Sequence, residues 1–110
     1  MNLKIDYHEY DNRNVVRVDG EIDAYTAPKL REVLIPMTEK QGASTIIDLS
    51  HVSYMDSTGL GVFIGALKSV NAHNGTMKII GLTQRVERLF NITGLAEVID
   101  IDPTVRGGLS

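Results

Sequence analysis

One stretch of the chain, from Thr45 to Asn74, constrains the fold more than any other. It begins with an apolar run, Ile46–Leu49, which predicts a buried strand. A short polar connection leads to Asp56–Gly59, and Leu60–Val70 then forms an apolar segment long enough for a helix. A strand that feeds a helix through a short loop is half of a βαβ unit. The stretch therefore predicts an α/β fold.

The residues between this strand and helix are of the kinds that begin helices. Asp56 and Ser57 stand where the N-cap is expected, at the positive end of the helix dipole and beside unpaired backbone N–H groups. A plain helix cap is the simpler interpretation of this pair. A phosphorylation site is the other, because a phosphate at a helix N-terminus meets free N–H donors and a favourable dipole.

The predicted helix is unusual because it is apolar nearly all round, which is typical of a helix that is buried or faces a partner. Gly61 and Gly65 are four residues apart and share one face. Each costs roughly 1 kcal/mol relative to alanine in a helix interior. These glycines either allow close packing inside the molecule or form a smooth surface beside Ser57 on which another protein lands.

The segments before this stretch predict a hairpin and a helix. Residues 3–8 alternate between apolar and polar, and Val15–Val18 is a second strand that Asp19-Gly20 ends. Thr26 then reads as a cap, with Pro28 in the first helical turn. Pro36 falls inside the helical spacing and should either kink the helix or stop it near Ile35.

The segments after it predict strand, helix and strand. Asn74-Gly75 is a strong stop for the central helix, and Met77–Ile80 is the next strand. Thr83 caps a short helix that ends near Asn91, and Val98–Ile101 is a last short strand.

These elements predict one α/β domain, with a mixed β-sheet of about five strands, an N-terminal hairpin and right-handed crossovers, covered by helices on one face or both. We assign residues 1–102 to this domain and residues 103–110 to a loose C-terminal tail. Asp23 and the Asp56-Ser57 pair both lie at strand-to-helix junctions. We therefore expect them to converge on one functional edge of the sheet.

Composition excludes several classes of function. The chain has 110 residues and a net charge of −3, and no basic patch suggests nucleic acid. It has no cysteine, so a disulfide framework, a thiol nucleophile and Cys-ligated zinc are excluded. No window reaches the apolar length of a transmembrane helix, and Met1–Lys4 lacks the apolar core of a signal peptide. We expect a cytoplasmic protein without a membrane or nucleic-acid partner.

The sequence also argues against an enzyme. Ser57 could act as a nucleophile only with a base, and the G-x-S-x-G elbow is absent. The histidines at positions 8, 51 and 73 are isolated, and Gly59-Leu60-Gly61 lacks the G-K-[ST] of a phosphate loop. Asp23, Asp48 and Asp56 show no metal-ligand spacing. We expect no catalytic residue, no metal and no cofactor, and a Ser57-dependent enzyme is the least favoured alternative.

Three segments resemble one known family. Val52–Phe63, which reads V-S-Y-M-D-S-T-G-L-G-V-F, resembles the signature of the STAS family, specifically its bacterial anti-sigma-factor antagonists. Gly20–Leu30 and Arg88–Leu95 resemble two further segments of that family. The first motif is the most specific and is closest in wording to antagonists of the general-stress sigma-factor pathway.

The resemblance implies a partner-switching regulator of transcription. In that family the unphosphorylated antagonist binds an anti-sigma factor, itself a serine kinase, and so releases the sigma factor. The kinase uses ATP to phosphorylate the serine of the D-S-[ST]-G motif, Ser57 here, and a metal-dependent serine phosphatase reverses this. A small-ligand or nucleotide-binding STAS module is the alternative. The partner-binding residues that we expect are Asp23, Asp56, Ser57, Thr58, Gly59, Gly61 and Gly65.

Overall fold

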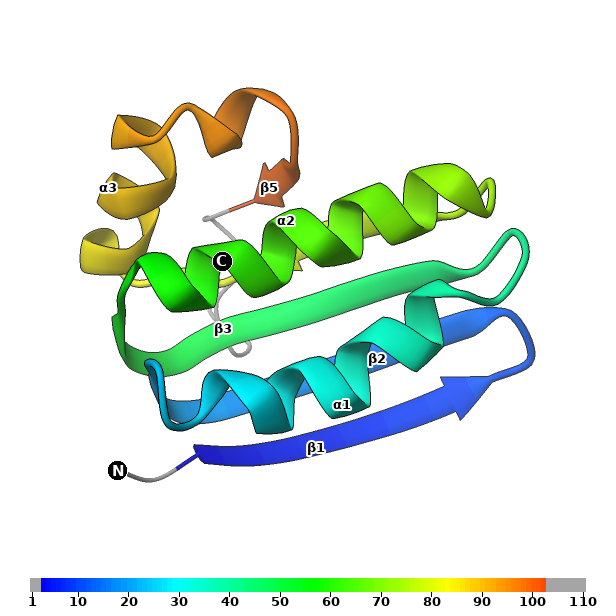
Figure 1. Ribbon diagram of the computed structural model, residues 1–110, viewed down its shortest axis with the longest axis horizontal. Coiled ribbons are helices and arrows are strands. Elements are labelled where there is room, and N and C mark those ends of the chain that lie inside the picture. The colour runs from blue at the N-terminus through cyan, green and yellow to red at the C-terminus, as the bar shows by residue number, and fades with distance from the viewer. Residues whose placement is uncertain (1–2, 103–110) are drawn as a thin grey trace.

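A five-stranded sheet forms the centre of the computed structural model, which describes residues 3–102 (Figure 1). Its strands lie side by side in chain order: β1 (Leu3–Tyr10), β2 (Arg13–Ile22), β3 (Ser44–Met55), β4 (Thr76–Ile80) and β5 (Asp100–Asp102). β1 and β2 pair in antiparallel fashion, and all the other neighbours are parallel. The predicted mixed sheet with an N-terminal hairpin is therefore confirmed.

The helices gather on one face of this sheet. α1 (Ala27–Thr38) and α2 (Ser57–Ala72) lie side by side across it, and α3 (Gln84–Ile92) packs beyond α2, before a short 3-10 turn, η1 (Leu95–Glu97) (Figure 1). The rings of Phe63 in α2 and Phe90 in α3 are 6.0 Å apart. Right-handed crossovers between strands in chain order bring successive helices to the same face. The sequence left open whether helices cover one face of the sheet or both. Within residues 3–102 they cover one face.

The core fills the space between the sheet and these helices. Strand residues at alternate positions point into it, because side chains along a strand alternate between its two faces. The fully buried side chains include Val16 and Val18 of β2, Ile47 and Leu49 of β3, and Phe63 of α2. Burial of this apolar surface is the main force that holds α1 and α2 on the sheet.

Two strands are longer than the sequence predicts. β2 continues past Asp19-Gly20 to Ile22, and β3 continues past Leu49 to Met55, so the predicted ends of both strands are wrong. The polar residues of these extensions are tolerated because β2 and β3 pair with each other along the whole length, with irregularities in register near Asp19 and Gly20. Because of these extensions, the two strands end side by side, and Asp23 and Asp56 are the residues that follow their ends.

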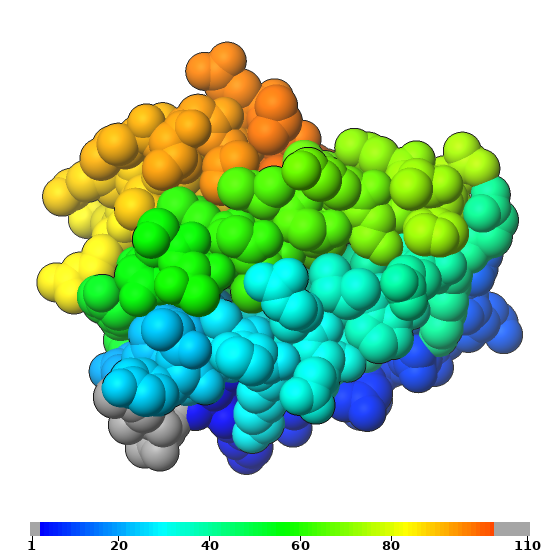
Figure 2. All heavy atoms as spheres, in the orientation of Figure 1, coloured from blue at the N-terminus to red at the C-terminus, as the bar shows by residue number. Residues whose placement is uncertain are grey.

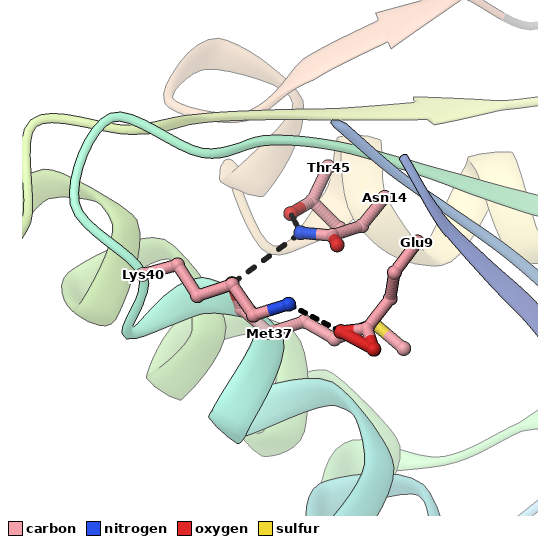
Figure 3. A network of polar contacts seen from close by, with 5 residues as sticks. All are labelled: Glu9, Asn14, Met37, Lys40 and Thr45. Atoms are coloured by element: carbon pink, nitrogen blue, oxygen red, sulfur yellow. Dashed lines mark hydrogen bonds and ion pairs between the residues drawn. The ribbon is translucent and has the colours of Figure 1, made fainter. Parts of the chain in front are cut away.

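Pro36 does not stop α1, which continues to Thr38. Side chains bond two of the carbonyl groups of this last turn. Asn14 Nδ2 lies 3.4 Å from the Met37 carbonyl oxygen and 3.1 Å from Thr45 Oγ1 (Figure 3), and the Thr38 hydroxyl donates to the Ile35 carbonyl oxygen at 2.7 Å. These contacts replace the bonds that a helix end lacks.

The C-terminal part follows the prediction with one shift. Thr83 caps α3, since its hydroxyl oxygen accepts from the Val86 N–H at 3.3 Å. The positive φ of Asn74, 58°, ends α2 as expected. The last strand is Asp100–Asp102 and not residues 98–101, because η1 and the residue after it still turn. The predicted loose tail, residues 103–110, lies outside the described residues.

Candidate functional site

Asp23 and Asp56 follow directly after two neighbouring strand ends. Ile22 and Met55 are the last partners in the β2–β3 register, so the next residue of each strand leaves the sheet at the same edge. The backbone N–H of Asp56 donates to the carbonyl oxygen of Ile22 at 3.2 Å. The predicted convergence of the two strand-to-helix junctions is confirmed. Figure 2 shows the segment before α1, in light blue, against the first turn of α2, in green.

Asp56 is the N-cap of α2. Its backbone is extended, with φ −115° and ψ −171°, and its Oδ1 accepts hydrogen bonds from the N–H of Thr58 at 2.9 Å and of Gly59 at 3.4 Å. This is the geometry that gives aspartate its preference for the N-cap position. The capping interpretation is therefore correct for Asp56.

Ser57 takes no part in the cap. It is the first residue of α2, its side chain is exposed, and its hydroxyl makes no hydrogen bond within the part of the chain that the structure describes. A serine chosen for helix initiation would use its oxygen to accept from the helix N–H groups. The structural requirement is met by Asp56, and the Ser57 hydroxyl is left facing solvent at the end of the helix.

Few backbone donors are available around this hydroxyl. Asp56 occupies the N–H groups of Thr58 and Gly59, and the Leu60 N–H bonds to the Asp56 carbonyl at 3.2 Å. The N–H of Ser57 itself makes no hydrogen bond with any described residue. The expectation that a phosphate here meets several free donors is therefore wrong for this conformation. A phosphate on Ser57 has one nearby free donor and a neighbouring carboxylate.

Asp23 is held rigidly in the loop between β2 and α1. Its Oδ1 accepts from the N–H of Tyr25 at 2.9 Å, the N–H of Thr26 at 3.0 Å and the Thr26 hydroxyl at 3.2 Å. Desolvation raises the pKa of this carboxyl, but the hydrogen bonds from Thr26 and Tyr25 outweigh it, so the pKa of Asp23 lies below its ordinary value. Asp23 therefore carries a fixed negative charge beside Asp56.

Thr26 supports this loop and not the helix that follows. It stands at the N-cap of α1 as predicted, yet its side chain makes no capping bond. Its hydroxyl instead contacts the Glu21 carbonyl oxygen at 2.8 Å and accepts from the Asp23 N–H at 2.9 Å. These bonds tie the end of β2 to the start of α1.

Gly59 joins the two halves of the site by close packing. A Cβ at this position would lie 2.7 Å from Ile22 Cγ2 and 2.7 Å from Met55 Cγ, so only glycine fits without a shift of these neighbours. Gly59 is buried. Whether a partner contacts it stays a prediction, and its own role in the fold is to let the first turn of α2 approach the ends of β2 and β3.

Gly61 and Gly65 have different surroundings, although they share a face of α2. A Cβ at Gly61 would meet nothing within 4 Å, which excludes the core-packing interpretation for this residue. A Cβ at Gly65 would come within 3.8 Å of Arg31 Nη1 and 3.9 Å of Ile35 Cδ1, so Gly65 lies against α1. Beside the exposed Ser57 and Thr58, Gly61 leaves the first two turns of α2 with a low, open surface.

Comparison with known proteins decides the family of this fold. The STAS domain model matches residues 4–108, nearly the whole chain. The chain belongs to the STAS domain family. The resemblance of its three segments is thereby confirmed.

Two relatives of this STAS domain carry the same name, and a solved structure has a similar one. It is similar to the anti-sigma-B factor antagonist of Bacillus subtilis (strain 168), at 50% identity over 109 residues that cover 99% of both chains. A protein of the same name from Listeria monocytogenes is 50% identical over 102 residues, covering 92% of this chain and 90% of the relative. The crystal structure of an anti-sigma factor antagonist from Mycobacterium paratuberculosis matches with a TM-score of 0.83 at 26% identity, over 94% of this chain and 88% of that one.

One exposed residue of this STAS domain escaped the sequence analysis. Tyr25 lies two residues after Asp23 in the same loop and is 82% exposed. An aromatic side chain held out beside a site is a common anchor in protein interfaces. The signal was present in the sequence, since Tyr25 lies inside the Gly20–Leu30 segment, but only the structure shows that it is not part of the core.

Metal-ligand clusters and membrane-spanning helices are both absent from the described residues. Within residues 3–102 no group of three or more His, Cys, Asp or Glu side chains is placed to hold a metal ion, and no helix is long and apolar enough to cross a membrane. The hydroxyl of Ser57 is not bonded to any of the three histidines. His51 contacts Arg17 and Ser50, and His73 Nδ1 contacts the Ser69 carbonyl oxygen at 2.7 Å.

Proposed function

We propose that this protein is an anti-sigma-factor antagonist whose unphosphorylated form binds an anti-sigma factor and so releases a sigma factor. The anti-sigma factor is a serine kinase, and phosphorylation of Ser57 ends the complex. The observation that carries the proposal is that Asp56 and Ser57 have different roles at the start of α2. Asp56 makes the helix cap, and the exposed Ser57 hydroxyl has no structural task. The names of the relatives at 50% identity support the same role.

The surface around Ser57 suits a residue that must enter the active site of another protein. Ser57 and Thr58 are exposed at the tip of α2, and the missing side chain of Gly61 keeps the next turn low. Tyr25 stands on the neighbouring loop and offers a large contact area. A kinase domain could therefore approach this end of the sheet without rearrangement of the backbone.

Electrostatics give phosphorylation its effect. A phosphate adds roughly −1.5 to −2 charges near neutral pH. It would stand next to the Asp56 carboxylate, near the fixed charge of Asp23, with one free backbone donor close by. The unmodified surface presents the partner with the two carboxylates of Asp23 and Asp56. Phosphorylation would add a bulky group and further negative charge to that surface. A hundredfold loss of affinity needs only about 2.7 kcal/mol.

The cycle assigns the chemistry to the partners. ATP belongs to the kinase, the metal belongs to a serine phosphatase that removes the phosphate from Ser57, and this chain is a substrate and not an enzyme. We place the exchange in the bacterial cytoplasm. The alternative of a small-ligand or nucleotide-binding module is less well supported, because Asp56 already occupies two of the backbone donors that an anionic ligand would need.

One experiment tests the proposal directly. The protein is incubated with its cognate anti-sigma factor and ATP, its mass is measured and the modified residue is mapped. We expect one phosphate, on Ser57, and none on the Ser57→Ala variant, which should still bind the anti-sigma factor. Thr58→Ala is the matched control and should be phosphorylated like the wild type. Phosphate on Thr58, or an unmodified wild-type chain, would overturn the assignment, and a nucleotide titration of the protein alone tests the ligand-binding alternative.

A further inference from the structure

β1 is one of the two outermost strands of the sheet, and no strand or helix among the described residues covers its outer edge. Within residues 3–102 it pairs with β2 alone, and Figure 1 shows it along one rim of the molecule with no element beyond it. It has eight residues, contains no proline, and is exposed along most of its length. An outer strand of this kind presents unpaired backbone N–H and C=O groups, which are a template for another strand.

The hairpin geometry identifies which residues present these groups. A two-residue loop, Asp11-Asn12, joins β1 to β2, so Tyr10 and Arg13 close the hairpin as a hydrogen-bonded pair. Because the direction of the backbone groups alternates along a strand, every second residue from Tyr10 bonds to β2. The residues whose backbone groups point outward are Leu3, Ile5, Tyr7 and Glu9. The ammonium group of Lys29 donates to the Leu3 carbonyl oxygen at 3.1 Å, in agreement with this alternation.

Side chains from α1 and the segment after it contact the two ends of this edge. Lys29 occupies the carbonyl of Leu3 at one end. At the other end Lys40 forms an ion pair with the Glu9 carboxylate, on the side of the strand that faces the end of α1 (Figure 3). Neither contact uses the backbone of residues 5–9, so the central segment of the edge remains open.

We propose that a second copy of the chain pairs with this open segment, strand against antiparallel strand, around a two-fold axis at Tyr7. In this register Tyr7 faces Tyr7 of the second copy, and Ile5 faces Glu9. All three residues have outward backbone groups, so the hydrogen bonds of the new ladder are complete over the segment. The contact is isologous and closes as a dimer, with one continuous sheet of ten strands.

Charge, the occupied Leu3 carbonyl and the length of the ladder select this register over its neighbours. With Tyr7 on the axis, Asp6 of each copy faces His8 of the other, in the closer type of antiparallel pair. Moving the axis to Asp6 would place two aspartates opposite each other. Moving it further toward the N-terminus would require the backbone of Leu3, which Lys29 occupies. Moving it to His8 would shorten the ladder and leave Ile5 unpaired.

This contact is independent of the proposed phosphorylation site. Ser57 follows β3, and β2 lies between β3 and β1. A dimer through β1 therefore leaves both copies of Ser57 accessible. Loss of the phosphorylation hypothesis would not affect the dimer, and loss of the dimer would not affect phosphorylation.

Sedimentation and amide exchange over a concentration series test the proposal together. We expect the mass to rise from 12.1 kDa toward twice that value. In the same series, exchange should slow at the amides of Ile5, Tyr7 and Glu9, while those of Asp6 and His8, which β2 already protects, should not change. A mass that stays monomeric up to about 1 mM overturns the proposal. A dimer without this alternating protection overturns it equally, because its interface lies elsewhere.

Two sets of variants test the register. Tyr7→Lys, at a side chain that is 50% exposed, brings two lysines together at the axis and should raise the dimer dissociation constant at least tenfold. Tyr54→Lys, at a tyrosine of β3 that is 42% exposed, is the matched control and should leave it unchanged. Asp6→Lys should also weaken the dimer, and the double change Asp6→Lys with His8→Glu should restore it. Circular dichroism confirms that each variant is folded, and an unchanged dimer in Tyr7→Lys refutes the register.

Discussion

The backbone N–H of Asp56 bonds to the carbonyl oxygen of Ile22, at 3.2 Å, and so locks the start of α2 to the end of β2. This bond lies beyond the last pair of the β2–β3 ladder, Ile22 with Met55. It places the end of β2, which Asp23 follows, against Asp56, the N-cap residue directly before Ser57. Both junctions of the site are thus tied to the end of β2, Asp56 through Ile22 and the Asp23 loop through the bond of Thr26 to Glu21.

Substitutions at two neighbouring glycines of α2 should have opposite effects. Gly61→Leu adds a side chain where a Cβ meets nothing within 4 Å, so the melting temperature should hold or rise, since leaving glycine gains helix propensity. The same side chain would separate the surfaces and weaken anti-sigma-factor binding by at least ~1.4 kcal/mol, about tenfold. Calorimetric titration with the partner measures this effect.

Gly59→Ala is the matched control for that experiment. Its new Cβ would lie 2.7 Å from Ile22 and Met55 side-chain atoms, and overpacking of this kind typically costs about 1–3 kcal/mol of stability. A Gly61→Leu protein that melts early, yet binds normally when folded, would show that our landing surface is wrong.

Substitution of Asp56 should separate its capping role from its charge. Asp56→Ala removes the acceptor for the Thr58 and Gly59 N–H groups and should lower the free energy of unfolding by about 1 kcal/mol. Asp56→Asn keeps a side-chain oxygen at the cap and should cost much less, since asparagine caps about as well as aspartate. Urea unfolding of the three proteins decides the point. Equal losses in both variants would mean that charge, and not the cap, stabilises the helix start.

Phosphorylation of Ser57 should leave the fold intact. Ser57 lies at an exposed helix end, where neither its hydroxyl nor its own N–H makes a hydrogen bond within the described residues. We expect chemical-shift changes between the two forms to cluster around Ile22–Tyr25 and Asp56–Gly61. Two-dimensional NMR of the phosphorylated protein and of the unmodified one makes this comparison. Changes spread across Met77–Ile101 would show a larger conformational switch.

Asp23 should make the free energy of unfolding depend on pH in the acidic range. The hydrogen bonds that it accepts from Tyr25 and Thr26 leave its pKa in the folded protein below the unfolded value of about 3.9. Its contribution to stability is therefore complete above the unfolded pKa and is lost as the pH falls through the folded pKa. Urea midpoints measured between neutral pH and acid for the wild type and Asp23→Asn test this. The difference between the two proteins should shrink as the carboxyl protonates, and a constant difference would contradict it.

The sequence by itself determined which helices and strands form and several of the residues that begin or end them. Hydrophobic periodicity predicted the hairpin, the helices and the sheet, and local chemistry predicted the caps at Asp56 and Thr83 and the stop at Asn74-Gly75. These signals work because they act within a few residues of the chain. The STAS signature around Ser57 was equally local, and the family match confirmed it.

Only the tertiary structure decided what depends on contacts between distant residues. β3 extends to Met55 because β2 pairs with it, and α1 passes Pro36 while Asn14, from β2, satisfies the carbonyl of Met37. The three glycines of α2 have different environments that the sequence does not distinguish. Gly59 packs on the strand ends, Gly61 faces open space and Gly65 lies against α1. The physical reason is the same in each case: the environment of a backbone group or a missing side chain is set by neighbours that the chain brings together only on folding.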